Sequence, residues 1–311
     1  MFDKFYAHII LAFIMSEYQL PDIPPCTPYD PSVSPGNYGY QPSLGWSIAF
    51  TLLFTAIAVG QTLHVLRTRA FWTVLFIVGA ILEIIGWVGR SISHRCPYSR
   101  TCFLMQTATL IMGPSWTQAG IYVTLWVLIR DIGRHVSPFP PKTYLVICFI
   151  IDSVCLITQA VGGGLAGSAY SSGISMQVGT TTMVVGIITQ LVAAVIFSFL
   201  LGIVIYRGAS ELRTNLPLFY VATATVFSTA MMIMRNVYRS IELTEGWRGY
   251  LITNERFVLA LDALPMVLSM GIYVFFNPGE QFWKQRVSVD GQELVGQDEV
   301  RNHALQRYLN L

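Results

Sequence analysis

Long apolar runs separated by short polar segments dominate the pattern of this chain. Each run holds about 19 to 29 residues, and a helix of about 20 residues crosses the ~30 Å hydrocarbon core of a membrane. No run shows the strict alternation of a barrel strand. The pattern therefore predicts an all-α membrane protein with seven transmembrane helices, at 44–66, 70–89, 103–129, 144–167, 178–206, 216–234 and 257–276.

Three regions follow from this pattern: a Pro-rich arm at 1–43, a transmembrane domain at 44–279 and a polar tail at 280–311. Within the arm, residues 5–15 form an apolar run that is too short to span. It is either a signal segment or a segment that lies at the interface. Residues 17–43 hold seven of the fifteen prolines, so they are predicted to be extended.

The distribution of Lys and Arg favours one orientation. With the N-terminus outside, eleven Lys and Arg fall on the inner side and eight on the outer side, which together are the 19 of the chain. Positive residues favour the cytoplasm in short loops. We therefore expect an extracellular arm and a cytoplasmic tail.

The five cysteines divide according to this topology. Cys148 and Cys155 fall inside the fourth run, whereas Cys26, Cys96 and Cys102 fall on the outer, oxidising side. Three cysteines allow three different pairs and leave one thiol over. The sequence does not choose between the pairs.

Composition excludes several classes of function. Only 12% of the residues are charged, about half the fraction of a soluble domain, and a net charge of +2 gives no basic patch for nucleic acid. The sequence contains no phosphate-binding loop, the three lysines lie outside the runs, and the five histidines are scattered. We expect no enzyme, catalytic residue, cofactor or metal site.

Four charged residues interrupt the apolar runs or lie at their ends: Glu83, Asp152, Arg235 and Asp262. Charge inside a membrane is costly, so such residues face a protein interior or a wet cavity and mark substrate paths. Glu83 and Arg90 are seven residues apart and share a helix face. They form either a charge pair that fixes packing or part of a substrate site.

A second set of charges surrounds the junction of the sixth and seventh runs: Arg235, Arg239, Glu242, Glu255 and Asp262. The two helices are antiparallel neighbours, so their charged ends meet at a similar depth. We expect Arg239 to pair with Glu255, and Arg235 to pair with Asp262 or Glu83. These pairs form either a clamp between helices or a gate.

Two further runs carry polar residues at helical spacing. Asp152 lies seven residues before Gln159 and is either a protonatable or cation-binding site or a protonated acid bonded to a neighbouring helix. Pro114 is predicted to kink the third run and free a backbone carbonyl. Gln118 and Tyr122, one turn apart, either line a pocket beside this kink or only bond between helices.

Several short motifs occur in a fixed order along residues 38–279. They are Tyr40, Pro42 and Ser43, then Glu83, Gly86 and Arg90, then Gly113 and Pro114, then residues 235–242, and finally Glu245, Gly246, Trp247, Tyr250, Glu255 and residues 262–266. Together these motifs resemble the fungal lipid-translocating exporter family, whose seven-span proteins are tied to 7-aminocholesterol resistance and to sphingoid long-chain-base release. One departure from the family pattern is Trp87, where the family has Tyr.

The resemblance implies a fungal protein of the plasma membrane or of a vacuolar-type membrane, with the plasma membrane favoured. Such a protein exports or flips amphipathic lipids and confers resistance to toxic compounds, with porphyrin uptake in one branch. Its partners would be membrane lipids or amphipathic small molecules. The residues themselves fit a cationic amphiphile whose amine meets Glu83, Asp152 or Asp262. Two alternatives stay open: a seven-helix receptor for a lipid-like ligand, and a regulator of lipid asymmetry that transports nothing.

Overall fold

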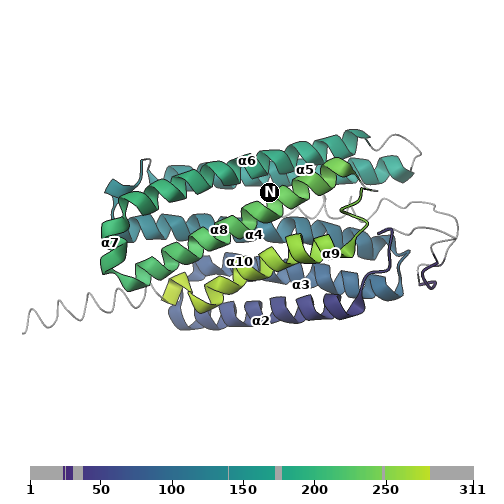
Figure 1. The fold of residues 1–311 in the computed structure, drawn as a ribbon, viewed down its shortest axis with the longest axis horizontal. Helices are drawn as coiled ribbons and strands as arrows, with labels where there is room; N and C mark the ends of the chain where they lie inside the picture. Colours follow the sequence, from purple (N-terminus) through teal and green to yellow (C-terminus); the bar gives the residue numbers. More distant parts are fainter. Residues whose placement is uncertain are drawn as a thin grey trace, which may run out of the picture.

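The computed structural model describes residues 24, 26–30, 38–138, 140–171, 177–246 and 249–280. Within these residues the protein is all-helical, and its long helices run side by side in an elongated bundle (Figure 1). The long helices are α2 (Leu44–Thr68), α3 (Val74–Arg95), α4 (Arg100–Ile132), α5 (Pro141–Ser171), α6 (Gln177–Arg207), α8 (Leu216–Glu245) and α10 (Leu264–Phe275). The short elements are η1 (Phe71–Thr73), η2 (Arg134–Val136), α7 (Ala209–Thr214), α9 (Glu255–Phe257) and the π-helical η3 (Val258–Ala263).

Six helical segments of the described chain are long and apolar enough to cross a membrane: Leu44–Thr68, Phe71–Arg95, Lys142–Ala166, Gln177–Arg207, Leu216–Glu245 and Glu255–Glu280. α4 has 33 residues but is less apolar. Its polar side chains are buried inside the bundle, including Gln106, Ser115, Thr117, Gln118 and Thr124. Polar residues of a membrane helix face other helices rather than lipid, so the position of α4 explains its composition.

The helices form a closed ring in which α2, α3, α4, α5, α6, α8 and α10 each pack on the next, and α10 packs on α2. α4 also packs on α8 across the ring. Large aromatic residues fill the interior, among them Phe54, Phe76, Trp87 and Phe197, which are all fully buried. Many large apolar side chains point outward instead, as a membrane protein in contact with lipid requires.

α8 and α3 extend furthest beyond the ends of their predicted runs, because polar residues continue both helices. The sixth apolar run ends at 234, but α8 continues to Glu245 because its charged face is buried against η3 rather than exposed. The second run was predicted to end at 89, whereas α3 continues to Arg95. This extension brings Glu83 close to the middle of its helix.

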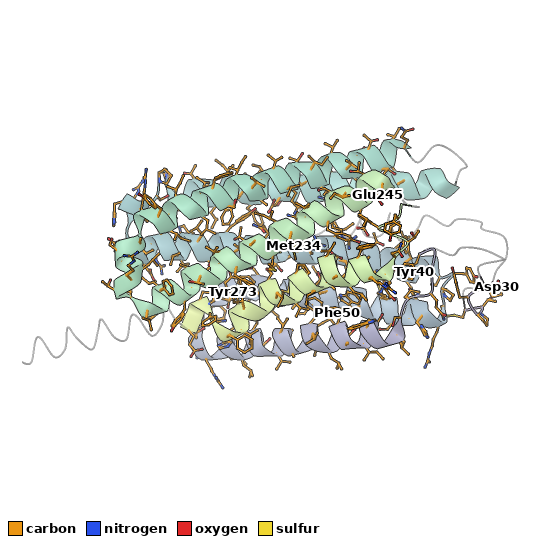
Figure 2. The ribbon with its side chains drawn as sticks, in the orientation of Figure 1. Asp30, Tyr40, Phe50, Met234, Glu245 and Tyr273 are labelled. Atoms are coloured by element: carbon orange, nitrogen blue, oxygen red, sulfur yellow. A yellow bond between two sulfur atoms is a disulfide. The ribbon has the colours of Figure 1, made fainter. Side chains whose placement is uncertain are left out.

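Residues 24, 26–30 and 38–43, here called the arm, pack on one end of the bundle, which we call the arm end. A disulfide joins Cys26 to Cys96 and leaves Cys102 free. The Tyr38 hydroxyl donates to Gln106 Oε1 at 2.8 Å. Asp30, Tyr40 and Glu245 all lie at this end (Figure 2). The predicted segment at 5–15 and the tail beyond Glu280 lie outside the described residues.

Candidate functional site

Two arginines from α8 converge on one carboxylate from η3. Arg239 donates from Nε to Asp262 Oδ1 at 3.1 Å and from its terminal nitrogen to Oδ2. Arg235 Nε approaches Oδ1 to 2.8 Å but not along its N–H direction, so this contact is an ion pair without a formed hydrogen bond. The Arg235–Asp262 pair that the sequence predicts is present. The π-turn of η3 precedes Pro265, and such turns are frequent at functional sites.

Arg235 is held in place by a backbone carbonyl that Pro114 of α4 leaves free. Pro114 has no N–H, so the carbonyl of Leu110, four residues earlier, has no helical donor. The terminal nitrogen of Arg235 donates to this carbonyl at 2.7 Å. The carbonyl that the sequence predicts to be free is thus the acceptor for a buried guanidinium, and α4 and α8 are joined at the level of Asp262.

Glu242 completes this part of the site on the arm side. It accepts from Arg239 at 2.9 Å and from the Tyr238 hydroxyl at 3.0 Å. With only 4% exposure, its charge requires these partners. Arg239 therefore bridges two carboxylates and is not available for Glu255.

Arg90 takes Glu255 instead, which corrects the predicted Arg239–Glu255 pair. The terminal nitrogen of Arg90 donates to Glu255 at 2.8 Å and to the Tyr40 hydroxyl at 2.6 Å. Its guanidinium carbon lies 5.6 to 5.7 Å from the ring centres of Tyr38, Tyr40 and Trp87, within cation–π range. Two segments distant in sequence, the arm and α9, thus meet on a single buried arginine.

The arm also binds Glu255 through its backbone, since the N–H of Ser43 donates to Glu255 Oε1 at 2.9 Å. Burial raises the pKa of Tyr40, and the positive charge of Arg90 opposes that rise. The Tyr40 hydroxyl is therefore neutral at physiological pH and accepts from Arg90. The sequence analysis named Tyr40 only as a motif residue and not as part of the site.

Glu83 lies beside this network without an ion-pair partner, and the side chain of Trp87, one turn further along α3, interacts with its carboxylate. It is 2% exposed, and its Oε1 has no hydrogen bond. Arg235 and Asp262 act on it electrostatically, but among the described residues it forms no ion pair. Glu83 faces α4 where Gly113 leaves space, since a side-chain carbon at Gly113 would come within 3.1 Å of Glu83 Oε1.

The charges around Glu83 therefore do not balance. Three arginines, of which Arg90 and Arg235 are buried and Arg239 is partly buried, each hold a carboxylate. These carboxylates are Glu255, Asp262 and Glu242. Glu83 is a fourth carboxylate for three cations. We call the seven residues the arm-end network: Glu83, Arg90, Arg235, Arg239, Glu242, Glu255 and Asp262.

A second polar cluster lies between α4 and α5, nearer the other end of the bundle. We call it the Asp152 cluster, and it consists of Gln118, Tyr122 and Asp152. The Tyr122 hydroxyl lies close enough to interact with both other side chains. Both oxygens of Asp152, both amide atoms of Gln118 and the Tyr122 hydroxyl are buried, and none of them has a hydrogen bond of good geometry. The structure therefore brings Asp152 of α5 together with Gln118 and Tyr122 of α4, which the sequence analysis treats as two separate groups.

Gln159 does not join Asp152, although the two residues share a helix. Its amide donates to Gln190 Oε1 at 3.1 Å, and Gln190 donates to Ser115 Oγ at 3.1 Å. This chain links α5, α6 and α4. The sequence analysis did not include Gln190 or Ser115, although a glutamine within the fifth apolar run was a usable signal.

Comparison with known proteins assigns the family. Residues 76–285 match the family described as RTA1 like protein. The chain belongs to this family. The RTA1-like match covers α3 to α10, and therefore both polar clusters, but not the arm or α2.

Curated relatives of this RTA1-like chain include membrane transporters of yeast. The sphingoid long-chain base transporter RSB1 of Saccharomyces cerevisiae is 29% identical over 81% of this chain and 75% of its own length. The protoporphyrin uptake protein 1 of the same species is 24% identical over 79% of this chain and 92% of its own. No solved structure matches the chain. The chain is thus an integral membrane protein related to lipid and amphiphile transporters.

Proposed function

We propose that this chain is a plasma-membrane exporter, or flippase, of amphiphiles that carry one positive charge, such as sphingoid long-chain bases. The observation that supports this proposal is the isolation of Glu83. A buried carboxylate with no cation of its own is a site for the amine of a ligand, because an unpaired charge in a membrane interior costs several kcal/mol.

Asp262 is the weaker candidate for an amine site. It already holds two guanidinium groups, so a third cation would meet their repulsion. Arg235 and Arg239 also act electrostatically on Glu83, but Glu83 forms an ion pair with neither of them. We therefore assign the amine to Glu83 and assign a structural role to Asp262, Glu242 and Arg239 as the clamp that closes the arm end.

The path that we propose follows α4. Its buried polar residues extend from Gln106 through Ser115, Thr117 and Gln118 to Tyr122, so they provide a polar lining through a bundle whose outer surface is apolar. We propose α4 as the seventh transmembrane helix. The alkyl chain of the amphiphile would stay in lipid or between helices while its head group moves along this lining.

We place the arm outside the cell and the tail beyond residue 280 in the cytoplasm. The disulfide at the arm end supports this orientation because disulfides persist in oxidising compartments. The substrate class is supported by the printed name of the yeast sphingoid-base relative. Export of a toxic amphiphile would confer resistance to it.

Flux in reconstituted vesicles tests the proposal. The probe is an 18-carbon sphingoid base with a fluorophore at the end of its alkyl chain, and its N-acylated form, which carries no positive charge, is the ligand control. We expect the purified protein to move the base but not the N-acylated form. Glu83→Gln should reduce the flux by about tenfold or more, because an ionic contact is worth over 1.4 kcal/mol.

Glu211→Gln is the matched control, because the carboxylate of Glu211 on α7 is partly exposed to solvent and lies outside both polar clusters. The substitution should leave the flux unchanged. Flux at the normal rate through Glu83→Gln would contradict the assigned role of Glu83. Saturable binding of the base without flux would assign the chain as a receptor. If neither binding nor flux occurs, a regulatory role follows.

A further inference from the structure

The Asp152 cluster holds many buried polar atoms, although it is separate from the ion pairs of the arm-end network. Five such atoms on three side chains lack a hydrogen bond of good geometry: both Asp152 oxygens, both amide atoms of Gln118 and the Tyr122 hydroxyl. The Tyr122 hydroxyl approaches both other side chains, but a single hydroxyl cannot satisfy all the other four atoms. The exposed fractions are 5%, 2% and 1% for Asp152, Gln118 and Tyr122. Native proteins leave only a few buried polar groups unsatisfied per hundred residues, so this concentration indicates a bound species.

No basic residue compensates the charge of Asp152. The titratable groups that act on it are Tyr122 on α4 and Cys148 and Cys155 on its own helix. From α6, the polar residue that reaches this region is the uncharged Gln190, through Gln159. The buried arginines of the described chain all belong to the arm-end network. An ionised Asp152 would therefore have to take its counter-charge from outside the described chain.

The surroundings of the cluster favour a small species. The ring of Tyr122 packs on Phe197 at 4.6 Å between centres, and Phe197 is fully buried. Carboxylate, amide and phenol oxygens are ligands for hard cations or for a protonated water. A single carboxylate balances a single positive charge. These features favour a monovalent ion over a divalent one as the occupant of the cluster.

We infer that Asp152, Tyr122 and Gln118 form a second binding site, distinct from Glu83, for a small monovalent cation, either a proton or Na⁺, whose movement drives the export. The coupling part of this inference rests on the proposed function. Both sites act on α4: Glu83 faces Gly113, and Asp152 faces Tyr122. Nine residues separate these two positions, or about 14 Å along the helix, and Pro114 lies between them.

Cation binding is tested first without any transport. In purified protein, Na⁺ as occupant should raise the melting temperature by about 2 to 4 °C relative to equal choline chloride, because a ligand that binds the folded state stabilises it. A proton as occupant should give a carboxylic acid band in infrared difference spectra that disappears with rising pH.

Three variants test whether the signal comes from the Asp152 cluster. Asp152→Asn should abolish whichever signal appears, and Tyr122→Phe should weaken it. Asp131→Asn, at the end of α4, should leave the signal intact. If neither signal appears in the unaltered protein, the inference is wrong.

Coupling is tested in the same vesicles that test the proposed function. With one cation exchanged per amphiphile, a tenfold gradient of the coupling cation should support up to about tenfold accumulation of the base. Protein-free vesicles correct for passive redistribution of a weak base. We expect Asp152→Asn to carry flux that no longer responds to pH or Na⁺ gradients. If flux through Asp152→Asn still responds to the gradients, Asp152 does not couple them to export. If the unaltered protein shows no flux at all, the proposed function is wrong, and the binding experiment alone tests the cation site.

Discussion

Glu83 and Asp262 are both buried carboxylates, yet their surroundings give them opposite roles. Asp262 is held by two guanidinium groups, whereas Glu83 has none. Breaking a buried ion pair from one side is strongly destabilising because the other charge stays buried. Neutralising an unpaired carboxylate removes a cost instead.

This contrast predicts the stability of two conservative variants. Asp262→Asn should destabilise the protein by about 3 to 5 kcal/mol, because Arg235 and Arg239 lose their shared carboxylate. Glu83→Gln should be as stable as the unaltered protein or more stable. Melting of the purified proteins at one fixed heating rate measures both effects. Equal destabilisation by the two variants would show that Glu83 is also paired.

Tyr38 gives a prediction of pH dependence at the arm. Burial raises the pKa of Tyr38 to about 12, against opposing effects of Ser93 and Arg90, while an unfolded tyrosine ionises near 10. The neutral form is thus favoured in the folded state. Its contribution is complete below about pH 10 and is lost as the pH rises to about 12.

We therefore expect alkaline titration to weaken the attachment of the arm by roughly 2 to 3 kcal/mol between these pH values. Tyr38→Phe should be less stable at neutral pH, because Gln106 loses its donor, but should lose less stability on going to high pH. Melting temperatures measured across the alkaline range test this. Parallel curves for the two proteins would show that Tyr38 does not titrate in this way.

At the scale of elements, glycines set how closely α5 and α6 pack. A side-chain carbon at Gly162 would come within 2.7 Å of the backbone carbonyl oxygen of Gly179, whereas one at Gly202 would meet nothing within 4 Å. Backbone cannot move aside as a flexible side chain does. The two glycines therefore differ in packing but not in helical context.

Gly162→Ala should destabilise the protein by about 1 to 3 kcal/mol through overpacking. Gly202→Ala should be neutral or stabilising by up to about 1 kcal/mol, because alanine is the better helix former. The comparison uses thermal melting of both variants in the same detergent. Similar destabilisation by the two substitutions would show that close packing at Gly162 is not the cause.

The pattern of apolar runs predicts the long helices well, because a membrane allows few alternatives to a helix of 20 residues. Partnerships among the charges are less predictable. Sequence spacing places Arg235 near Asp262, but it does not show that the arm brings Tyr40 and Ser43 onto Arg90 and Glu255. Such contacts depend on how helices rotate and where the arm returns, and the isolation of Glu83 follows from them.

At the scale of the whole molecule, the cysteines report which side of the membrane holds the arm. With the arm outside, Cys26 and Cys96 should be disulfide-bonded in cells, as they are in the structure. In Cys148→Ser/Cys155→Ser protein, Cys102 is then the remaining thiol. It is half-buried and should react slowly with a membrane-impermeant maleimide added to intact cells.

Mass tagging of thiols before and after reduction checks this orientation, with Cys102→Ser as the control that should acquire no tag before reduction. Labelling of Cys102 only after the cells are opened would place the arm in the cytoplasm. Such a result would reverse the proposed direction of every helix, while leaving the internal geometry of both polar clusters unchanged.

The bond between Arg235 and the Leu110 carbonyl has a mechanical consequence. One guanidinium holds α4 through a carbonyl that Pro114 leaves without a donor, and holds η3 through Asp262. Arg235 therefore links three segments: α8, which carries it, α4 and η3. Any separation of α4 from α8 wide enough to admit a head group must first break the contact of Arg235 with the Leu110 carbonyl. The freed guanidinium then needs another anion. Glu83 already interacts electrostatically with Arg235 and holds no arginine. Opening of the passage and release of an amine from Glu83 would then be one exchange of partners, in which Arg235 replaces the amine at Glu83.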